Sequence, residues 1–263
     1  MAVVTSHGTE IYYEAWGEGT ETLIFAHGMG GNAAIWYHQI AAFSPRYRTI
    51  AFDHRYFGRS GCAVEDFRPA LFADDLLAIM EAENIATAVL ICQSMGGWTG
   101  SQMVLRHPER VRGLVMSHTP GVFYHPNVVN DPAAVADLVS QPRGQFGSAA
   151  LAHDFPGKNP PGAVLYSMIS SFNNIDPAVI PRAIGQAGLG VNTETLTDYA
   201  TPTLFVTGDL DVLFPAEYIA SLAATLPGAR CVNLGAVGHS SYFETPSAFN
   251  DTLAAFLEEI ASG

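Results

Sequence analysis

Short apolar runs recur along this chain and are separated by longer segments of mixed composition. Each run is apolar throughout instead of alternating with polar residues, which is typical of strands buried on both faces of a parallel sheet. The runs are TLIFA (22–26), TIAF (49–52), AVLIC (88–92), GLVMS (113–117), TLFVT (203–207) and RCVNL (230–234). The segment TEIYYEAW (9–16) is more mixed and, with the residues before it, predicts an antiparallel hairpin at the sheet edge.

Helical stripes lie between the apolar runs. Their apolar residues recur three, four, seven or eight positions apart, which places them on one face of a helix. The two clearest stripes are Phe72, Leu76, Ile79 and Met80, and Phe249, Leu253, Phe256, Leu257 and Ile260. Alternating strands and one-sided helices predict an α/β fold with a doubly wound, mostly parallel sheet. The ligand site of such a fold lies beyond the carboxyl ends of its strands.

The alternation stops in the middle of the chain. The stretch from 119 to 201 has many prolines, scattered glycines and no run typical of a buried strand. We expect residues 1–118 and 202–263 to form the core domain, and 119–201 to form an inserted cap, or lid, over the cleft. A poorly ordered loop is the alternative, but the insertion holds large apolar side chains that need burial: Phe123, Tyr124, Phe146, Phe155, Tyr166, Met168, Ile169 and Phe172.

Composition narrows the classes of protein that fit. Of the 263 residues, 48% are hydrophobic and 14% are charged, so the chain can bury a large core. A formal net charge of −13 argues against binding to nucleic acid or to an anionic membrane. No apolar run is long enough to cross a membrane, and the N-terminus MAVVTSHGTEIYYE has no signal-peptide pattern. We therefore expect a soluble, unprocessed, cytoplasmic protein.

The cysteines carry little information about stability or metal binding. Cys62, Cys92 and Cys231 are an odd number with no CxxC and no paired Cys/His spacing. This argues against a disulfide framework and against a structural zinc site. Reduced thiols fit the cytoplasmic expectation.

The stretch LICQSMGG (90–97) is the strongest chemical motif. An apolar run leads directly into Ser94, with the small residues Cys92 and Gly96 two positions before and after it. A nucleophile on a sharp turn between strand and helix needs small neighbours there, because strand and helix approach closely. The alternative is that Ser94 only caps the helix predicted over 95–107. Its place after a central buried strand favours a nucleophile.

A serine hydroxyl is a weak nucleophile until a base accepts its proton, and an acid must hold that base in the right tautomer. The segment TGDLDVLFP (207–215) follows one predicted strand, and GAVGHSS (235–241) follows the next. Both segments therefore reach the sheet edge where Ser94 lies. They supply a carboxylate and then a histidine, in the chain order Ser, Asp, His that this architecture uses.

These motifs resemble those of the α/β-hydrolase fold superfamily over essentially the whole chain. The chain is similar to small serine esterases and lactonases, including enol-lactonases, carboxylesterases and ring-cleavage-product hydrolases. Gly208, Asp211 and Pro215 match the family pattern GxxDxxxP, which implies that Asp211 is the acid while Asp209 shapes the turn. His239, in GHSSYFETP, matches the family's general base. The alternative acid position of the family, in GLVMSHTPG, contains no carboxylate here.

The resemblance also implies an oxyanion hole formed by the backbone N–H groups of Met29 and Met95. Met29 lies in FAHGMGGN (25–32), where His27 is expected to brace the loop. A phosphate-binding function of this loop lacks both the Walker lysine and the GxGxxG spacing. DHRYFGRS (53–60) resembles the family's DxRGxGxS segment, with Tyr56 in place of a glycine. We expect the tyrosine to change the loop shape and to turn its ring toward the cleft.

The combined motifs predict a serine hydrolase that cleaves a small, largely apolar carboxylic ester or lactone through an acyl-enzyme. Its catalytic residues are Ser94, Asp211 and His239, and no metal or organic cofactor is implied. A small-molecule substrate is the expected partner, nucleic acid and membrane are not, and homo-oligomer formation is left open. Candidates for the wall of the substrate pocket are His118, Phe123, Tyr124, Phe214 and Tyr242.

Three alternatives share the fold. Hydrolases of carbon–carbon bonds in ring-cleavage products usually have asparagine before the nucleophile, where this chain has Gln93. Cofactor-free haloperoxidases share the triad and the sequence SMGG. A non-catalytic ligand-binding protein is the third, since fold does not fix function. Dehalogenases and typical epoxide hydrolases are disfavoured because Ser94 stands where they have aspartate.

Overall fold

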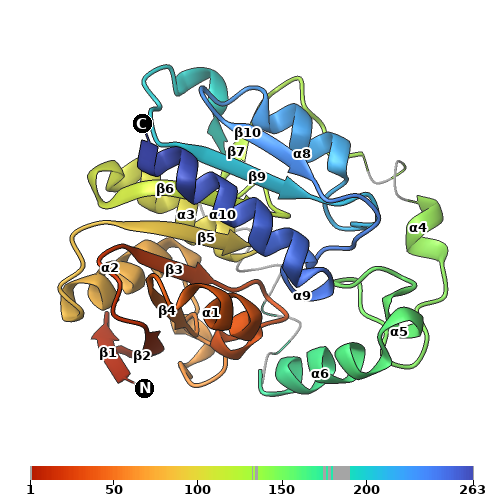
Figure 1. Cartoon of the computed structure of the whole chain (residues 1–263), viewed down its shortest axis with the longest axis horizontal. Helices are drawn as coiled ribbons and strands as arrows, with labels where there is room; N and C mark the ends of the chain where they lie inside the picture. The colour runs from red at the N-terminus through yellow and green to blue at the C-terminus, as the bar shows by residue number, and fades with distance from the viewer. Residues whose placement is uncertain are drawn as a thin grey trace.

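An eight-stranded sheet runs through the middle of the molecule in the computed structural model, which describes residues 2–131, 133, 136–173, 176, 179 and 190–262 (Figure 1). The strand order is β1-β2-β4-β3-β5-β6-β9-β10. The strands are β1 (Ala2–Ser6), β2 (Thr9–Trp16), β3 (Thr22–Ala26), β4 (Arg48–Phe52), β5 (Ala88–Gln93), β6 (Val111–Ser117), β9 (Thr203–Thr207) and β10 (Arg230–Asn233). Pairing is antiparallel at β1/β2 and β2/β4 and parallel from β4 through β10.

The predicted fold class is confirmed. The runs predicted at 22–26 and 203–207 coincide with β3 and β9, and the run at 88–92 extends by one residue in β5. Every residue of β3, β5 and β9 is buried, because helices cover both faces of the sheet there. The predicted N-terminal hairpin is the antiparallel pair β1/β2 at one edge.

Two helical layers cover the sheet. Core side chains of α2, α3 and α8 cluster on one face, and those of α1 and α10 cluster on the other. The helices of the core are α1 (Tyr37–Phe43), α2 (Phe72–Ala82), α3 (Gly96–Arg106), α8 (Ala216–Ala223), α9 (Ser241–Glu244) and α10 (Pro246–Ser262). Short 3-10 turns lie at Ala33–Trp36, Val64–Asp66, Pro69–Leu71, Pro108–Arg110 and Thr193–Thr195. Within the described part of the chain, no helix is long and apolar enough to cross a membrane.

The predicted apolar stripes are the buried faces of two of these helices. Phe72, Leu76, Ile79 and Met80 of α2 are all buried against the sheet. In α10, Phe249, Leu253, Phe256 and Leu257 are buried, and Ile260 packs at the rim of the same cluster. The helical spacing therefore identified the core-facing sides correctly.

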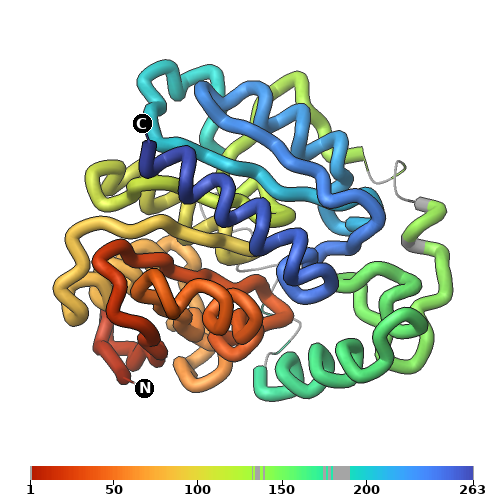
Figure 2. Tube along the Cα trace, viewed as in Figure 1, coloured from red at the N-terminus to blue at the C-terminus, as the bar shows by residue number. Residues whose placement is uncertain are grey.

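The described part of the insertion forms short helices beside the core. These are α4 (Ala136–Ser140), α5 (Phe155–Lys158) and α6 (Pro160–Ser171), and a small parallel pair joins β7 (Phe123–Tyr124) to β8 (Val191–Asn192). Figure 2 shows α5 and α6 outside the sheet, on the side of the core where α9 lies. Part of the predicted cap, including 180–189, lies outside the described residues. The exact domain boundaries stay a prediction.

Helix α6 is tied to the loop that follows β3. Asn32 donates its side-chain N–H to the carbonyl of Ile169 at 3.0 Å, and Ser170 donates its hydroxyl to the carbonyl of Gly30 at 2.5 Å. Asn173, just beyond the helix, donates to the carbonyl of Gly31 at 2.9 Å. The C-terminal end of α6 is therefore fixed to residues 30–32.

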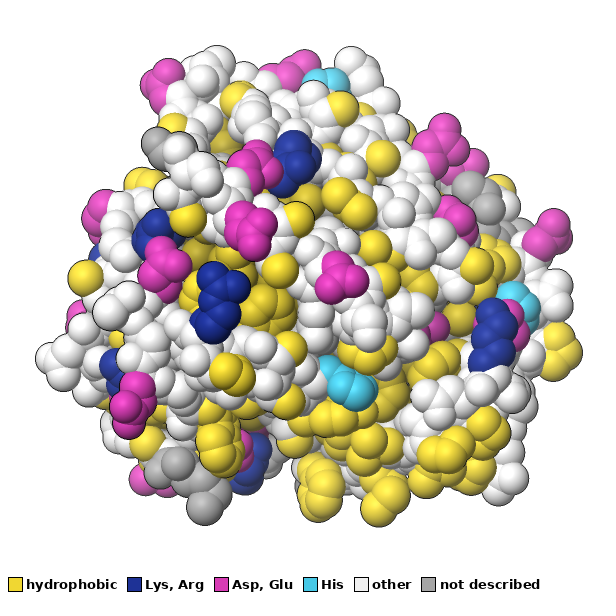
Figure 3. Space-filling model, in the orientation of Figure 1, with side chains coloured by type: hydrophobic (Ala, Val, Ile, Leu, Met, Phe, Trp, Pro, Cys, Tyr) yellow, Lys and Arg dark blue, Asp and Glu magenta, His cyan; other side chains and the backbone are white. Residues whose placement is uncertain are grey.

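The large apolar side chains of the insertion divide between two environments. Phe123, Phe155, Tyr166 and Ile169 are buried as expected, but others remain on the surface. On α6 the outward side chains are Leu165, Met168 and, at the C-terminal end, Phe172, which is 72% exposed. Hydrophobic side chains accordingly gather over the position of α6 in Figure 3. The expectation of burial was wrong for Tyr124, Phe146, Met168 and Phe172. Met168 and Phe172 are exposed because α6 packs on the core with one face only.

A buried ion pair joins the loop after β4 to α2. The Arg55 guanidinium donates to both carboxylate oxygens of Asp75, at 2.7 and 2.5 Å, and both side chains are essentially inaccessible. Arg55 also donates to the carbonyls of Ser6 and Asp66. A bidentate pair with its remaining donors satisfied is stable, but either charge left alone would be very costly.

Replacing Arg55 with leucine should lower the free energy of unfolding by about 3–5 kcal/mol, because Asp75 would stay buried without its partner. Urea denaturation measures this change. Arg112→Leu is the matched control, since its ion pair with Glu21 is exposed and is worth less than about 1 kcal/mol. Similar losses in the two variants would contradict the argument.

Glu244 of α9 connects the insertion to the segment after β10. Its carboxylate accepts hydrogen bonds from the backbone N–H groups of Ala152, Gly238 and Ser240, at 3.1, 3.2 and 3.4 Å. Burial raises its pKa from 4.5 to about 7, and the three amides only partly offset that rise. A raised pKa means that the folded state binds a proton more tightly than the unfolded chain does. The resulting stabilisation is complete below about pH 4.5 and is lost as the pH rises through about 7.

The free energy of unfolding of the wild type, relative to Glu244→Gln, should therefore fall between about pH 5 and pH 8 by something on the order of 3 kcal/mol. Urea denaturation at a series of pH values gives this difference. Glu258→Gln, at an exposed position on α10, should show no such trend. A difference that stays flat for Glu244→Gln would refute the pKa argument.

Candidate active site

Ser94 lies on a sharp turn between β5 and α3. Its backbone φ of +51° is in the left-handed region, which few residues other than glycine adopt without cost. The backbone N–H of Ser94 donates to the carbonyl of Ser117 at 3.0 Å, and its own carbonyl accepts from Gly97 at 2.8 Å. The turn therefore holds the side chain of Ser94 out at the carboxyl end of a central strand, as the motif predicts.

Glycines around this turn are required by close contacts. A Cβ on Gly28 would lie 2.0 Å from Gln93 Oε1 and 2.9 Å from the Cβ of Ser94. A Cβ on Gly96 would lie 2.2 Å from the carbonyl oxygen of Ala26. Real Cβ atoms do not approach so closely, so the loop after β3 can rest against Ser94 only because these side chains are missing.

Cys92 occupies the place where the family pattern has a glycine. It is fully buried, and a Cβ added to Gly100 of α3 would lie 2.7 Å from its sulfur. The extra volume of the thiol is therefore accommodated by a glycine on the facing helix. Burial raises the pKa of the Cys92 thiol, so this group is inert packing.

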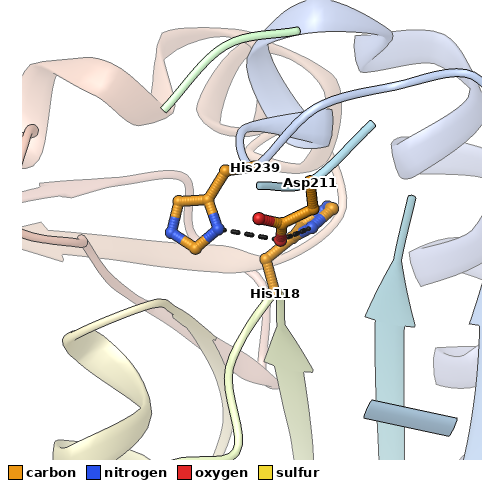
Figure 4. A group of neighbouring side chains, drawn as sticks. All are labelled: His118, Asp211 and His239. Carbon is orange, nitrogen blue, oxygen red and sulfur yellow. Dashed lines mark hydrogen bonds and ion pairs between the residues drawn. The ribbon is translucent and has the colours of Figure 1, made fainter. Parts of the chain in front are cut away.

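The acid and the histidine meet at the same edge of the sheet. Asp211, in the loop after β9, accepts a hydrogen bond from His239 Nδ1 to its Oδ2 at 2.9 Å (Figure 4). Asp211 Oδ1 accepts from the backbone N–H groups of Leu213 and Phe214 at 2.8 and 3.0 Å. Burial alone would raise the pKa of Asp211, but the neighbouring imidazoles outweigh it and hold that pKa well below its usual range.

His239 is buried and has one ring nitrogen available. The ionised Asp211 carboxylate has only acceptors, so His239 Nδ1 carries a proton and donates to it. In the neutral form of this tautomer, the lone pair lies on Nε2. Among the described residues, neither His239 Nε2 nor the Ser94 hydroxyl has a hydrogen-bond partner, so the two are not bonded to one another. Gln93 links the two segments, because its side-chain N–H donates to the carbonyl of His239 at 3.0 Å.

The two predicted oxyanion donors follow Gly28 and Ser94. Neither the Met29 N–H nor the Met95 N–H donates a hydrogen bond to any described group. His27 is buried behind the loop, donates from Nδ1 to the carbonyl of Gly28 at 2.7 Å, and accepts from the backbone N–H of His54 at 3.0 Å. Burial lowers the pKa of His27, so the neutral ring fixes the loop from inside the protein.

Asp209 and Tyr56 make contacts of their own outside the Asp211–His239 pair. Asp209 is exposed and accepts a hydrogen bond from Asn233 at 2.7 Å. Tyr56 takes the positive φ of +78° that glycine would otherwise supply, and its ring stacks on Phe67 at 5.1 Å. The hydroxyl of Tyr56 accepts from the backbone N–H of Asp176 in the insertion at 3.4 Å, and the orientation of the ring toward the cleft stays a prediction.

His118 is the main residue whose place the sequence did not reveal. We expected it on the pocket wall, but it is fully buried behind Asp211, with Nδ1 2.9 Å from Asp211 Oδ2. Its Nε2 lies 2.8 Å from the hydroxyl of Ser241 (Figure 4). One signal was present: GLVMSHTPG ends a strand predicted near that of Asp211, and histidine is its one titratable side chain.

The other residues expected on the pocket wall do not all lie there. Tyr242 was expected there, but it is 1% exposed and packs in the core against Trp36, with the ring centroids 4.4 Å apart. Phe123 is likewise buried against Tyr199, while Tyr124 is 44% exposed. Phe214 is half-buried with its ring 5.8 Å from that of His239, so it is the candidate that borders the Asp211–His239 pair.

Among the described residues, His118, Asp211 and His239 form a group that could hold a metal ion. One ligand atom each of His118, Asp211 and His239 lies within 4.8 Å of the others. Both imidazoles already direct Nδ1 at Asp211 Oδ2, and Asp211 Oδ1 is taken by two amides. A metal ion would have to replace both Nδ1 protons, whereas hydrogen bonds explain the arrangement as it stands.

Known proteins resemble this chain over nearly its full length. RutD of Azorhizobium caulinodans, a protein proposed to hydrolyse a carbamate, is 27% identical, with 97% of this chain and 98% of RutD aligned. Pimeloyl-[acyl-carrier protein] methyl ester esterase of Yersinia enterocolitica is 27% identical, with 95% of this chain and 98% of the esterase covered. The structure of Est816, an N-acyl homoserine lactone degrading enzyme, superposes with a TM-score of 0.77 at 26% identity, covering 97% of this chain and 100% of that one.

The family assignment follows from the match and from the fold together. Residues 21–246 match the family model of the alpha/beta hydrolase fold. That range contains Ser94 on its turn, the buried Asp211 and His239, and every strand from β3 to β10. The relatives are hydrolases by name, and their similarity extends along the whole chain. The chain belongs to the alpha/beta hydrolase fold family and is an esterase- or lactonase-like member of it.

Proposed function

We propose that this protein is a serine hydrolase that cleaves a small, largely apolar carboxylic ester or lactone through an acyl-enzyme. The observation that carries the proposal is the buried hydrogen-bonded pair of Asp211 and His239. Among the described residues, His239 Nε2 has no partner, and the pair lies at the same edge of the sheet as Ser94 on its left-handed turn. A buried imidazole with its second nitrogen unpaired is suited to accept a proton from a nucleophile.

In the first step, the oxygen of Ser94 attacks the carbonyl carbon of the substrate while its proton moves to His239 Nε2. The ring becomes an imidazolium, which the carboxylate of Asp211 stabilises through the Nδ1 hydrogen bond of 2.9 Å. A modest movement of either side chain, or the arrival of substrate, must bring Ser94 Oγ and His239 Nε2 into hydrogen-bonding range. Such tightening is common in this class of site.

The negative charge on the attacked carbonyl oxygen requires donors that are already in place. The N–H groups of Met29 and Met95 are the candidates, because they flank Ser94 and have no internal hydrogen bond among the described residues. Donors fixed in this way stabilise the developing charge without reorganisation. Helix α6 and the residues just after it support Met29, since Ser170 bonds to the adjacent backbone at Gly30 and Asn173 to that at Gly31.

The tetrahedral intermediate then collapses, and the bond to the leaving alcohol breaks. That alcohol takes the proton from His239, which leaves an acyl group on Ser94 and a neutral imidazole. Water attacks the acyl-enzyme with His239 again acting as the base, and the carboxylic acid departs. A lactone follows the same path, except that its alcohol stays attached to the acyl chain until hydrolysis.

The substrate class is supported by the insertion and by the relatives. The half-buried ring of Phe214 borders His239, and the described cap helix offers mainly apolar and hydroxyl side chains. The Yersinia relative is an esterase of a methyl ester, and Est816 degrades a lactone. Carbamates, the substrate class proposed for RutD, expose a carbonyl to the same attack and belong in the same comparison.

Ser94→Ala should lower the rate of hydrolysis of a short nitrophenyl ester by about 10⁴-fold or more, because the nucleophile is removed. Absorbance of released nitrophenol measures the rate, and Ser221→Ala, at an exposed position on α8, is the matched control. Mass spectrometry of the wild type after quenching should find the acyl group on Ser94. Full activity in Ser94→Ala would disprove the proposal.

The same two proteins separate the substrate classes. Esters, lactones, carbamates and ring-cleavage dienoates, offered in parallel, should give turnover that depends on Ser94. The highest kcat/KM is expected for an apolar ester or lactone. A preference for the dienoate would favour carbon–carbon bond hydrolysis, and tight binding without turnover would favour a receptor.

Asp211→Asn should reduce kcat by about 10⁴-fold, because an amide favours the wrong tautomer of His239 and cannot stabilise its charged form. Asp209→Asn is the matched control and should keep most of the activity, since that side chain is exposed and bonded to Asn233. Steady-state kinetics of the two variants decide the assignment. A larger loss in Asp209→Asn would reverse it.

A further inference from the structure

A second histidine holds the carboxylate that orients the proposed base. His118 follows β6 directly, is fully buried and has a backbone φ of +54°. Its N–H donates to the carbonyl of Val206 in β9 at 2.8 Å, so its backbone is fixed beside the strand that leads into the loop of Asp211. A left-handed conformation is costly for histidine, and it persists only where surrounding contacts stabilise it.

The protonation state of His118 follows from its partners. Asp211 Oδ2 is an acceptor at 2.9 Å, so His118 Nδ1 carries the proton and donates. Burial lowers the pKa of His118 although Asp211 opposes the shift, which favours the neutral ring, and in that form Nε2 is an acceptor. The hydroxyl of Ser241, 2.8 Å away, is then the donor to Nε2. The chain of donors runs from Ser241 through His118 to Asp211.

The carboxylate of Asp211 therefore has four donors. Leu213 and Phe214 donate to Oδ1, while His118 and His239 share Oδ2. Rotation of the carboxylate would break several of these bonds at once, so its plane is fixed. Because two imidazoles divide the charge of one oxygen, His118 also limits how strongly that oxygen can stabilise a charged His239.

We infer that His118 is a positioning residue for the acid of this site. It orients the carboxylate of Asp211 toward His239, and it reduces the negative charge of Asp211 Oδ2 that is available to stabilise a protonated His239. This inference rests on the proposed function for its kinetic consequences, but the hydrogen-bond geometry can be tested without turnover. Glu244 in α9 is a further titratable group near this site, because the charge of Asp211 contributes to its raised pKa. Its contribution has to be separated from that of His118.

Two substitutions suit the left-handed backbone at this position. His118→Gly removes the donor and tolerates a positive φ. His118→Asn also tolerates it and places an amide N–H near the position of the imidazole Nδ1. In the glycine variant we expect kcat to fall by about 10- to 100-fold, the loss typical of an outer partner of a reacting group. The asparagine variant should recover most of that loss, with KM nearly unchanged in both.

The pH profile distinguishes positioning from general damage to the fold. Without the donor from His118, the full negative charge of Asp211 Oδ2 acts on His239 and favours its protonated form. The acid limb of kcat/KM should therefore move to higher pH by about one unit. The asparagine variant should keep the wild-type limb. The same shift should persist in a Glu244→Gln background, which removes the other titrating neighbour.

NMR supplies a readout that needs no activity. In protein labelled with ¹⁵N-histidine, the His239 Nδ1 proton should move downfield in His118→Gly, because its bond to Asp211 becomes stronger. If His118→Gly fails to fold, Ser241→Ala should give a smaller shift in the same direction. If Ser94→Ala keeps full hydrolysis, the proposed function fails, while this measurement still decides the role of His118.

Three results would overturn the inference. One is a pH profile and an Nδ1 resonance that stay at their wild-type positions in His118→Gly. The second is an equal loss of kcat in the glycine and asparagine variants, which would mean that the donor is irrelevant. The third is a stoichiometric metal ion in purified protein that is lost with His118, which would make the three side chains a metal site.

Discussion

The buried carboxylate of Asp211 is the group around which the candidate site is organised. An ionised carboxylate removed from water is unstable unless hydrogen bonds replace its hydration. Its four donors come from its own loop, from the end of β6 and from the loop after β10. Because the protein must satisfy this charge, the ends of three strands are held in one fixed relation.

The turn at Ser94 brings a second constraint to the same edge of the sheet. A left-handed serine between a buried strand and a helix leaves little room, and Gly28 and Gly96 lie where a Cβ would collide with neighbouring atoms. Gln93 then uses its amide to hold the backbone of His239. The nucleophile candidate and the histidine are thus joined through the residue next to the serine, not through a direct bond between their side chains.

The described part of the insertion contacts the same segments from outside the core. Tyr166 of α6 lies where a Cβ on Gly30 would come within 3.0 Å of its hydroxyl, and the hydroxyl of Ser240 donates to it at 3.4 Å. Glu244 meanwhile accepts from a cap amide and from two amides of the histidine segment. The insertion therefore contacts the loop of the proposed oxyanion donors and the segment of the proposed base.

The sequence by itself determined the strands, the core-facing helix stripes, the turn at Ser94 and the segments that carry Asp211 and His239. These features depend on local patterns: continuous apolarity, helical spacing, and small residues around a turn. Parallel strands then bring their carboxyl ends to one edge without further information. Only the tertiary structure decided that His118 lies behind Asp211, that Tyr242 packs on Trp36, and that Met168 of α6 faces outward. His118 and Asp211 are separated by 93 positions, and such contacts are set by how distant segments pack, which no local pattern encodes.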